Sequence, residues 1–312
     1  MKYVIRKIVT MLITLMAVSA LVFISFQLIP GNPAISRLGT EATPEKVARL
    51  THELGLDRPL LTRYFEWIKG IFRWDFGMSY SYNQTVTSLI SDKLAITLML
   101  SFIAIIITVI VAFPLGIYAA RKSDTKLDVV INALNQFIMA VPSFFSGILI
   151  TLVFGVILRI FTPGAFVSYK VNMLKCISYL IFPAIAIALP KISMVVKLLK
   201  DTCLQEAKKD YVRTAYSRGN RTKAVFYKHV LKNAMVPVIT FLSMTFADII
   251  AGSMIVEQVF SVPGLGRLLL TSISGRDYPV CEAIILFLAF FVVFSNLLVD
   301  LFYRVLDPRI RV

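Results

Sequence analysis

Charged side chains are scarce in this sequence. Asp, Glu, Lys and Arg make up 16% of the 312 residues, whereas about 25% is usual in a soluble domain. The three cysteines and two histidines have no paired spacing and give no recognisable disulfide framework or metal site. A phosphate-binding Gly-x4-Gly-Lys-Ser/Thr loop is also missing. We therefore predict no catalytic and no metal-binding residues, and expect any ATP to be handled by a partner.

The sequence contains long segments without any charged residue. Residues 8–36, 94–120 and 129–158 contain no charged side chain, and each is longer than the ~20 residues that cross a bilayer. Three shorter segments reach spanning length by including one charge each, Lys191, Asp248 or Glu282. The sequence predicts an all-α polytopic membrane protein with six transmembrane helices. Their approximate spans are 8–29, 96–120, 136–158, 176–197, 234–256 and 280–302.

The basic residues predict the orientation of these helices. The formal net charge is +15. If the N-terminus is cytoplasmic, the inner segments hold 20 Lys and Arg in 71 residues and the outer segments 13 in 102. Cytoplasmic loops normally carry this excess, so we predict that both termini are cytoplasmic. The first span continues unbroken through Leu28, which favours an uncleaved anchor over a cleaved signal peptide.

The long outer loop, residues 31–93, is predicted to contain two amphipathic helices. Thr43 and Pro44 are typical of an N-cap followed by a first-turn proline, and Gly55 is typical of the stop. A second helix is expected after Pro59, with apolar and aromatic side chains along one stripe. The loop is either a lid on the outer leaflet or a dock for an extracytoplasmic partner.

The loop between the fourth and fifth spans carries eleven basic residues in 191–233. From Leu204 to Arg218 apolar side chains recur at helical spacing, Gly219 supplies a left-handed stop, and Thr222 is expected to cap the next helix. A helix of this length is marginal alone in water, so we expect it to dock onto another surface, with anionic lipid as the alternative. The predicted apolar face consists of Leu204, Ala207, Tyr211 and Ala215.

A few residues within or beside the spans are candidates for a translocation path or gate. Asp248 lies near the middle of the fifth span, where an ionised carboxylate is costly, so it contacts either the substrate or a neighbouring helix. Pro142 interrupts the third span, which is tolerated where protein or a water-filled cavity surrounds the break. Glu257 and Glu282 either gate the path or solvate the helix ends. Pro263 and Gly264 form either a re-entrant gate or a surface turn.

Several motifs in this order resemble one family, the permeases of binding-protein-dependent ABC importers, and within it the peptide/nickel branch. The B-type subunits of dipeptide and oligopeptide permeases are the most similar. Arg213-Thr214-Ala215 replaces the wider family's Glu-Ala-Ala, as that branch typically shows. The resemblance rests on Leu28-Ile29-Pro30-Gly31-Asn32-Pro33-Ala34, Leu54-Gly55-Leu56-Asp57-Arg58-Pro59-Leu60, Asp75-Phe76-Gly77-x-Ser79-Tyr80, Val141-Pro142-Ser143-Phe144, Asp210-Tyr211-Val212-Arg213-Thr214-Ala215-x3-Gly219, His229-Val230-Leu231-Lys232-Asn233-Ala234-x2-Pro237, Val256-Glu257-x-Val259-Phe260-Ser261-x-Pro263-Gly264-Leu265-Gly266-Arg267, Arg276-Asp277-Tyr278-Pro279 and Leu306-Asp307-Pro308-Arg309-Ile310-Arg311.

The resemblance implies a type I ABC importer permease (MetI-like) fold in the cell membrane. It implies four partners: a second permease subunit, two ATP-binding subunits that use ATP and Mg, and an extracytoplasmic solute-binding protein. It divides the chain into 1–30, an outer loop 31–93, a transmembrane core 94–303 with a coupling loop about 198–233, and a tail 304–312. The residues implied in ATPase coupling are Glu206, Ala207, Asp210, Tyr211, Arg213, Thr214, Ala215 and Gly219. The residues kept as candidates for the path or gate are Pro142, Ser143, Asp248, Glu257, Pro263 and Gly264.

The substrate expected from this resemblance is a peptide, with a nickel or other metal chelate as the alternative in the same branch. A stand-alone secondary transporter or channel is a rival from another class, but it predicts internal repeats and more ionisable residues within the spans. A membrane-embedded enzyme is a weaker rival, because it needs a nucleophile with a His or carboxylate partner at membrane depth. No nucleic-acid partner is expected.

Overall fold

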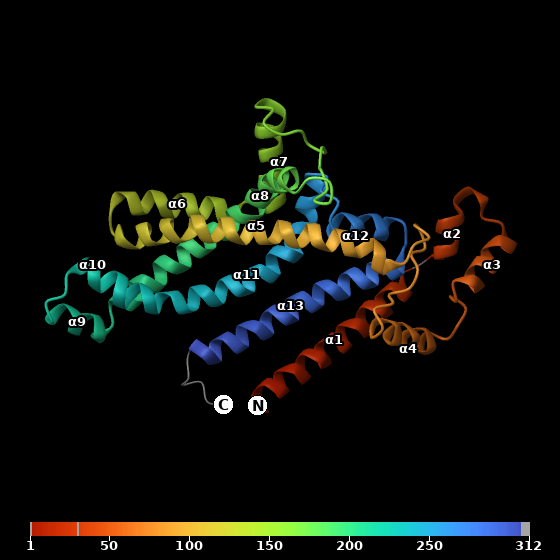
Figure 1. Ribbon diagram of the computed structural model, residues 1–312, viewed down its shortest axis with the longest axis horizontal. Helices are drawn as coiled ribbons and strands as arrows, with labels where there is room; N and C mark the ends of the chain where they lie inside the picture. Colours follow the sequence, from red (N-terminus) through yellow and green to blue (C-terminus); the bar gives the residue numbers. More distant parts are fainter. Residues whose placement is uncertain (1, 30, 307–312) are drawn as a thin grey trace. The chain divides into compact units, whose positions relative to one another are not determined.

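The computed structural model describes residues 2–29 and 31–306, and the helices are labelled in Figure 1. Within these residues the chain is helical, and its extended pairing is one isolated bridge between Met78 and Thr85. Pro30 and residues 307–311 of the motifs quoted above lie outside the described residues. The all-α fold is confirmed.

Five helices are long and apolar enough to cross a membrane, and a bent pair makes six if it counts as one span. Their apolar composition matches the predicted spans, but the boundaries differ. The second begins at Val86, so it is 36 residues and about 54 Å long. The five spans are Val4–Leu28, Val86–Arg121, Met173–Ala207, Thr222–Val259 and Tyr278–Leu298.

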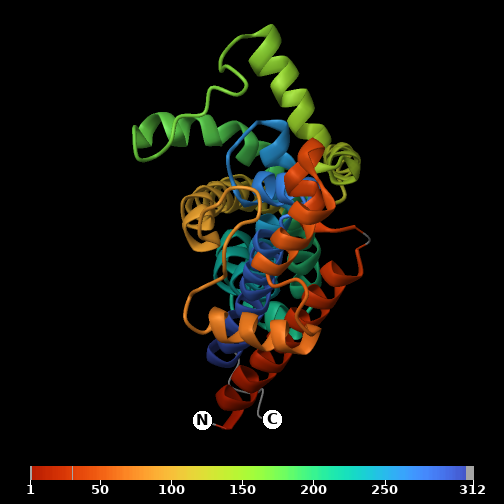
Figure 2. The same ribbon diagram turned by 90° about the vertical axis from the view of Figure 1, so that its right-hand side faces the viewer.

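The predicted third span is not a straight helix. Two helical segments, Lys126–Ala140 and Ser143–Ile157, meet at an angle of 96° (Figures 1 and 2). Pro142 has no N–H to donate, and Val141 before it has φ −82° and ψ 119°, the extended conformation that a following proline favours. The sequence predicted that Pro142 interrupts the helix, but it did not predict the right-angled turn.

The chain divides into two compact units. The first comprises Met1–Thr97 and Pro263–Leu297. Its helix α1 packs against the amphipathic helix α4, where Tyr64 shares a hydrogen bond of 2.9 Å with Ser19. Helices α3 and α4 begin at Pro44 and after Pro59, as predicted. The helices of this unit are α1 (Lys2–Leu28), α2 (Pro33–Leu38), η1 (Gly39–Glu41), α3 (Pro44–Glu53), α4 (Leu60–Ile71), the start of α5 (Val86–Arg121), α12 (Leu265–Ser274) and most of α13 (Tyr278–Leu306).

The second unit comprises Leu98–Val262 and Leu298–Val312. Helix α8 is its centre, because α6, α7 and α11 all pack against it. Helices α9 and α10 lie at one end of the unit (Figure 1). Its helices are the rest of α5, α6 (Lys126–Ala140), α7 (Ser143–Ile150), the π-helix η2 (Thr151–Ile157), α8 (Met173–Ala207), α9 (Asp210–Ser217), α10 (Thr222–Val225), the π-helix η3 (Phe226–Val230) and α11 (Leu231–Val259).

Candidate functional site

The segment between α8 and α11 contains a helix break that the sequence pattern did not predict. Helix α8 ends at Ala207, Lys209 is extended with φ −75° and ψ 151°, and α9 starts at Asp210. Glu206 bridges this break. Its carboxylate accepts hydrogen bonds from Lys209 Nζ at 2.5 Å and from the Tyr211 hydroxyl at 2.6 Å. One acidic side chain therefore holds the start of α9 against the end of α8.

These contacts change the protonation equilibria of the two donors. The hydrogen bond to Glu206 raises the pKa of Lys209 above its ordinary value, because the carboxylate stabilises the ammonium form. Partial desolvation of the exposed Tyr211 raises its pKa, and the bond to Glu206 acts in the same direction. Both side chains therefore keep their protons at neutral pH and remain donors to Glu206.

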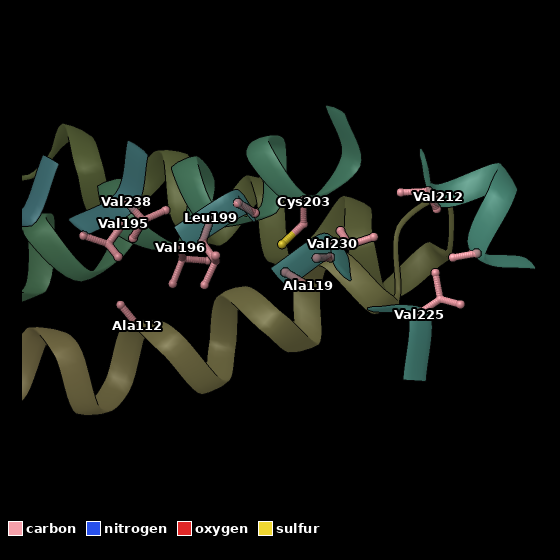
Figure 3. Close-up of a cluster of buried hydrophobic side chains, with 13 residues drawn as sticks. Ala112, Ala119, Val195, Val196, Leu199, Cys203, Val212, Val225, Val230 and Val238 are labelled. Atoms are coloured by element: carbon pink, nitrogen blue, oxygen red, sulfur yellow. The ribbon is translucent and has the colours of Figure 1, made fainter. Parts of the chain in front are cut away.

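The inward face of α9 is small and apolar. Val212 is 2% exposed and Ala215 6% exposed. They belong to a buried cluster shared with α5, α8, α10, η3 and α11, in which Val212 and Val225 lie close to one another (Figure 3). This burial attaches α9 to its own chain, so α9 is not a free amphipathic helix.

The buried face differs from the predicted one. An unbroken helix from Leu204 to Arg218 places Ala207 and Tyr211 on the same face as Ala215. In the structure Ala207 and Tyr211 are exposed, and Val212 is buried instead. The extended residue Lys209 is the reason, because it resets the helical phase between α8 and α9.

The outward face of α9 and its turns is polar and mainly basic. Asp210 and Arg213 have side chains 97% and 82% exposed, and their closest approach is 3.9 Å. Thr214 is also exposed. Other exposed basic side chains in this stretch are Lys208, Lys209, Arg218, Arg221 and Lys223. The segment therefore presents a charged surface that residues 2–29 and 31–306 leave uncovered.

Gly219 ends α9 as predicted. Its φ is +77°, in the left-handed region that residues with a Cβ rarely adopt, and no atom of the described part of the chain lies within 4 Å of the position a Cβ would take. Its N–H donates to Tyr216 O at 2.9 Å, and Asn220 Nδ2 donates to Ala215 O at 3.0 Å. The predicted cap at Thr222 is wrong: Arg221 occupies the N-cap, without a side-chain capping bond.

A polar contact between α6 and α8 lies in the same unit and was missed in the sequence. Lys200 Nζ contacts Asp128 Oδ1 at 2.5 Å and Asn132 Oδ1 at 3.1 Å, with the Lys200 side chain 8% exposed. Asn135 Nδ2 donates to Ser193 O at 3.0 Å. Asp128, Asn132 and Asn135 are spaced as one helical face, and this polar stripe is the signal that sequence reasoning had available.

Asp248, a candidate for the translocation path, forms an ion pair with a neighbouring helix. Its Oδ2 lies 3.3 Å from Lys191 Nζ of α8. The side chain of Asp248 is 67% exposed and that of Lys191 19%. The two charges that the fourth and fifth spans include are thus partners, as the predicted contact with a neighbouring helix requires. The exposed carboxylate also remains accessible.

Glu257, another path candidate of this unit, does not lie beside Asp248. Glu257 lies nine residues further along α11, about 13.5 Å away and on the opposite face of a regular helix. It is 0% exposed, so the expectation that it solvates a helix end is wrong. Pro142 and Ser143 form the first turn of α7, where Pro142 is exposed and Ser143 half-buried.

Pro263 and Gly264 belong to the other unit, where they precede α12. Gly264 is buried at the N-cap, and the next N–H, that of Leu265, donates to Thr97 Oγ1 at 2.9 Å. An exposed surface turn is therefore wrong for this segment. The turn is packed and starts a helix whose residues Leu265 and Leu268 are buried.

Asp277 joins two of the quoted motifs within the first unit. Its carboxylate is 0% exposed and accepts hydrogen bonds from Ser79 Oγ at 2.5 Å, Tyr80 N at 2.9 Å and Ser81 N at 3.1 Å. Burial, together with the negative charge of Glu282, raises the pKa of Tyr80 to about 12. The motifs at 75–80 and 276–279 are thus two halves of one contact. Both motifs were recognised in the sequence, but nothing in the sequence indicated that they contact each other.

Comparison with known proteins agrees with the motifs. Residues 112–312 match the family model described as binding-protein-dependent transport system inner membrane component, and residues 1–101 match the N-terminal model of such membrane components. A peptide transport system permease of Brucella abortus is 37% identical over 95% of both chains. The oligopeptide transport system permease AppB of Bacillus subtilis is 31% identical over 99% of both.

One further relative and one solved structure complete the comparison. The dipeptide transport system permease DppB of Lactococcus lactis is 30% identical over 99% of both chains. A crystal structure of an amino acid ABC transporter covers 70% of this chain and 94% of its own, with a TM-score of 0.51 and 19% identity, and it supports the fold alone. The family model and the relatives together establish the kind of protein. The chain belongs to the family of binding-protein-dependent transport system inner membrane components, the permeases of ABC transporters.

Proposed function

We propose that this permease carries peptides into the cell across the cell membrane by alternating access. The relatives from Bacillus subtilis and Lactococcus lactis, named for oligopeptide and dipeptide transport, cover 99% of this chain and support a peptide substrate. The chain carries out the membrane step and no ATP hydrolysis. A solute-binding protein on the outer side delivers the peptide.

The outward face of α9 is the surface that couples this chain to the ATP-binding subunits. The observation that carries this proposal is the contrast between the two faces of α9. Val212 and Ala215 attach α9 to the buried cluster, while Asp210 and Arg213 point away from it with exposed side chains. A short helix anchored on one side and charged on the other fits a groove in an ATP-binding subunit. Closure of two such subunits then moves the attached α8 and α11 as rigid bodies.

The full assembly has two permease subunits, two ATP-binding subunits and one binding protein. ATP and Mg act in the ATP-binding subunits, and this chain binds neither. Both termini lie in the cytoplasm, because eleven basic residues between 191 and 233 face the side where positive charge accumulates. This orientation places α9 on the same side as the ATP-binding subunits.

Reconstitution of the assembly tests the proposal. The chain is solubilised with whatever subunits co-purify, placed in liposomes, and supplied with its binding protein and either a di- or oligopeptide or a nickel chelate. We expect peptide to stimulate ATP hydrolysis and labelled peptide to accumulate inside. If only the nickel chelate stimulated ATP hydrolysis, the substrate would be a metal chelate and not a peptide. Transport by a lone homo-oligomer without an ATPase would overturn the proposal.

A further inference from the structure

The first unit contains a cavity of about 400 Å³, a volume in the usual range of small-molecule sites. Its walls come from the end of α1, from α3 and α4, from the loop after α4, and from the first turns of α13. Aromatic rings and charged groups of both signs contribute equally to the wall. The residues that matter here are Phe23, Arg63, Trp67, Tyr80, Tyr278 and Glu282.

Three polar groups of this wall form no hydrogen bond with the described residues. Glu282 is 4% exposed, and no hydrogen bond or ion pair is formed by its carboxylate within residues 2–29 and 31–306. Tyr278 is 6% exposed, and its buried hydroxyl has no hydrogen-bond partner in the same part of the chain. The buried Nε1 of Trp67 has none either. Buried polar groups are normally satisfied, so these three mark a place where a ligand supplies the missing bonds.

The charges of the wall indicate what kind of ligand fits. Two rim carboxylates are already paired, Glu66 with Arg58 at 3.3 Å and Glu53 with Arg49 at 2.8 Å. Arg63 donates to the neutral amide oxygen of Gln27 at 2.9 Å. The buried carboxyl group of Glu282 and the guanidinium of Arg63 therefore line the same cavity without forming an ion pair with each other. A ligand with one positive and one negative group satisfies both.

We propose that this cavity binds a zwitterionic headgroup whose primary ammonium reaches Glu282 and whose anionic oxygens reach Arg63 and Trp67 Nε1. Aromatic faces such as those of Tyr80 and Tyr278 also attract an ammonium group. The chemistry is that of an aminophospholipid headgroup such as phosphatidylethanolamine. A free amino acid or a short peptide carries the same two groups in soluble form.

The surface beside the cavity favours the lipid. Helix α4 supplies one wall, and its apolar stripe is exposed: Leu61 is 72%, Phe65 59% and the following Phe72 76% exposed. Helices α1 and α13, which supply other walls, are spans that contribute their terminal turns to the cavity. An amphipathic helix with exposed aromatic and aliphatic side chains at the end of a span is typical of the membrane interface, where lipid headgroups lie.

Lipid binding to the purified assembly tests this proposal without any transport measurement. The assembly containing the full chain is delipidated in detergent and titrated with dioctanoyl phosphatidylethanolamine, phosphatidylcholine or phosphatidylglycerol, with native mass spectrometry as the readout. Phosphatidylcholine keeps the phosphate but has no ammonium N–H, and phosphatidylglycerol has no ammonium. We expect phosphatidylethanolamine to bind about tenfold more tightly than either, as charge-assisted hydrogen bonds predict.

Two variants and one matched control locate the site. Glu282→Gln keeps the shape but removes the charge, and we expect it to abolish the preference for phosphatidylethanolamine. Trp67→Phe removes only the Nε1 donor, and we expect about threefold weaker binding with the same lipid order. Glu53→Gln changes a rim carboxylate already paired with Arg49, and we expect no change. Melting temperatures of the variants show whether each assembly is intact.

A titration with soluble dipeptides distinguishes a lipid headgroup from a soluble zwitterion as the ligand. Dialanine and N-acetyl-dialanine are titrated against the same assemblies. Binding of dialanine that requires Glu282, combined with equal binding of the three lipids, would assign the site to a soluble zwitterion and overturn the lipid. Binding of all ligands by Glu282→Gln as by the unchanged chain would overturn the site itself.

Discussion

Two segments outside the long apolar helices are held to the rest of the chain by opposite kinds of contact. In the first segment, residues 79–81 are fixed by the buried carboxylate of Asp277, which accepts three hydrogen bonds. In the α9 segment, Val212 and Ala215 bury small apolar surfaces, and the charged side chains remain exposed. The first arrangement is directional and fixes one geometry, while the second leaves a whole face available to a partner. The difference suits a structural anchor and a docking element, respectively.

The largest effect is expected where the directional contact is removed. Asp277→Ala leaves the backbone N–H groups of Tyr80 and Ser81 and the buried Ser79 hydroxyl without their acceptor, so we expect the free energy of unfolding to fall by about 3 kcal/mol. Thermal unfolding of the purified protein measures the loss, and limited proteolysis should show cleavage near residues 79–85.

Asp75→Ala is the matched control for Asp277→Ala. Asp75 Oδ1 accepts one hydrogen bond, from Gly77 N at 3.0 Å, and it is exposed. We expect a loss of at most about 1 kcal/mol. Equal losses for the two variants would show that the buried carboxylate is not the anchor of this segment.

The next effect concerns the turn that ends α9. Gly219→Val places a β-branched residue at φ +77°, which costs roughly 2 kcal/mol locally. We expect the protein to insert but to lose binding to the ATP-binding subunits, measured by co-purification. Gly219→Asn is the control, because asparagine tolerates the left-handed conformation and should retain binding. Intact ATP-coupled uptake by Gly219→Val would contradict the role of this turn in docking.

Neighbouring residues on the two faces of α9 separate folding from docking. Val212→Ala removes buried methyl groups and is expected to lower the free energy of unfolding by about 1 to 2 kcal/mol. Arg213→Ala changes a side chain that is 82% exposed, so stability should shift by less than about 0.5 kcal/mol. Binding to the ATP-binding subunits should nevertheless weaken in Arg213→Ala. If both variants changed stability alone, the outward face would not be a docking surface.

The smallest effect is expected at the exposed ion pair between α8 and α11. Asp248→Asn, combined with Lys191→Gln in a double-mutant cycle, should give a coupling energy of at most about 1 kcal/mol, because the Asp248 side chain is 67% exposed. The pair of Lys200 and Asp128, with side chains 8% and 13% exposed, serves as the buried comparison and should give more. Uptake of peptides of different charge tests whether Asp248 also contacts the substrate. A change in uptake by Asp248→Asn that depends on the charge of the peptide would place Asp248 on the translocation path.

Local signals predicted the elements well where the responsible residues are neighbours in sequence. The N-cap at Thr43, the proline that opens α4, and the left-handed Gly219 all depend on one or two residues and their own backbone. The helix break at Lys208 and Lys209 has no such signal, because neither lysine opposes a helix. The contact of Glu206 with Lys209 and Tyr211 accompanies the break, and it exists only once the chain has folded.

The candidate path shows the same limit. Asp248 and Lys191 were each identifiable as a costly charge within a span, yet 57 residues separate them and no periodicity links them. Burial of Glu257, Asp277 and Glu282 was equally hidden, because acidic residues near a span end are expected to reach water. Each of these outcomes depends on which helices pack together.

The sequence by itself determined that the chain is helical and membrane-embedded, and its ordered motifs identified the family. These properties follow from apolar length and from local backbone preferences, which act within a few turns of helix. Tertiary structure alone decided the right-angled bend between α6 and α7, the buried face of α9, the pairing of Asp277 with residues 79–81, and the cavity around Glu282. Such features depend on contacts between distant residues, whose energies exist only when the helices have packed.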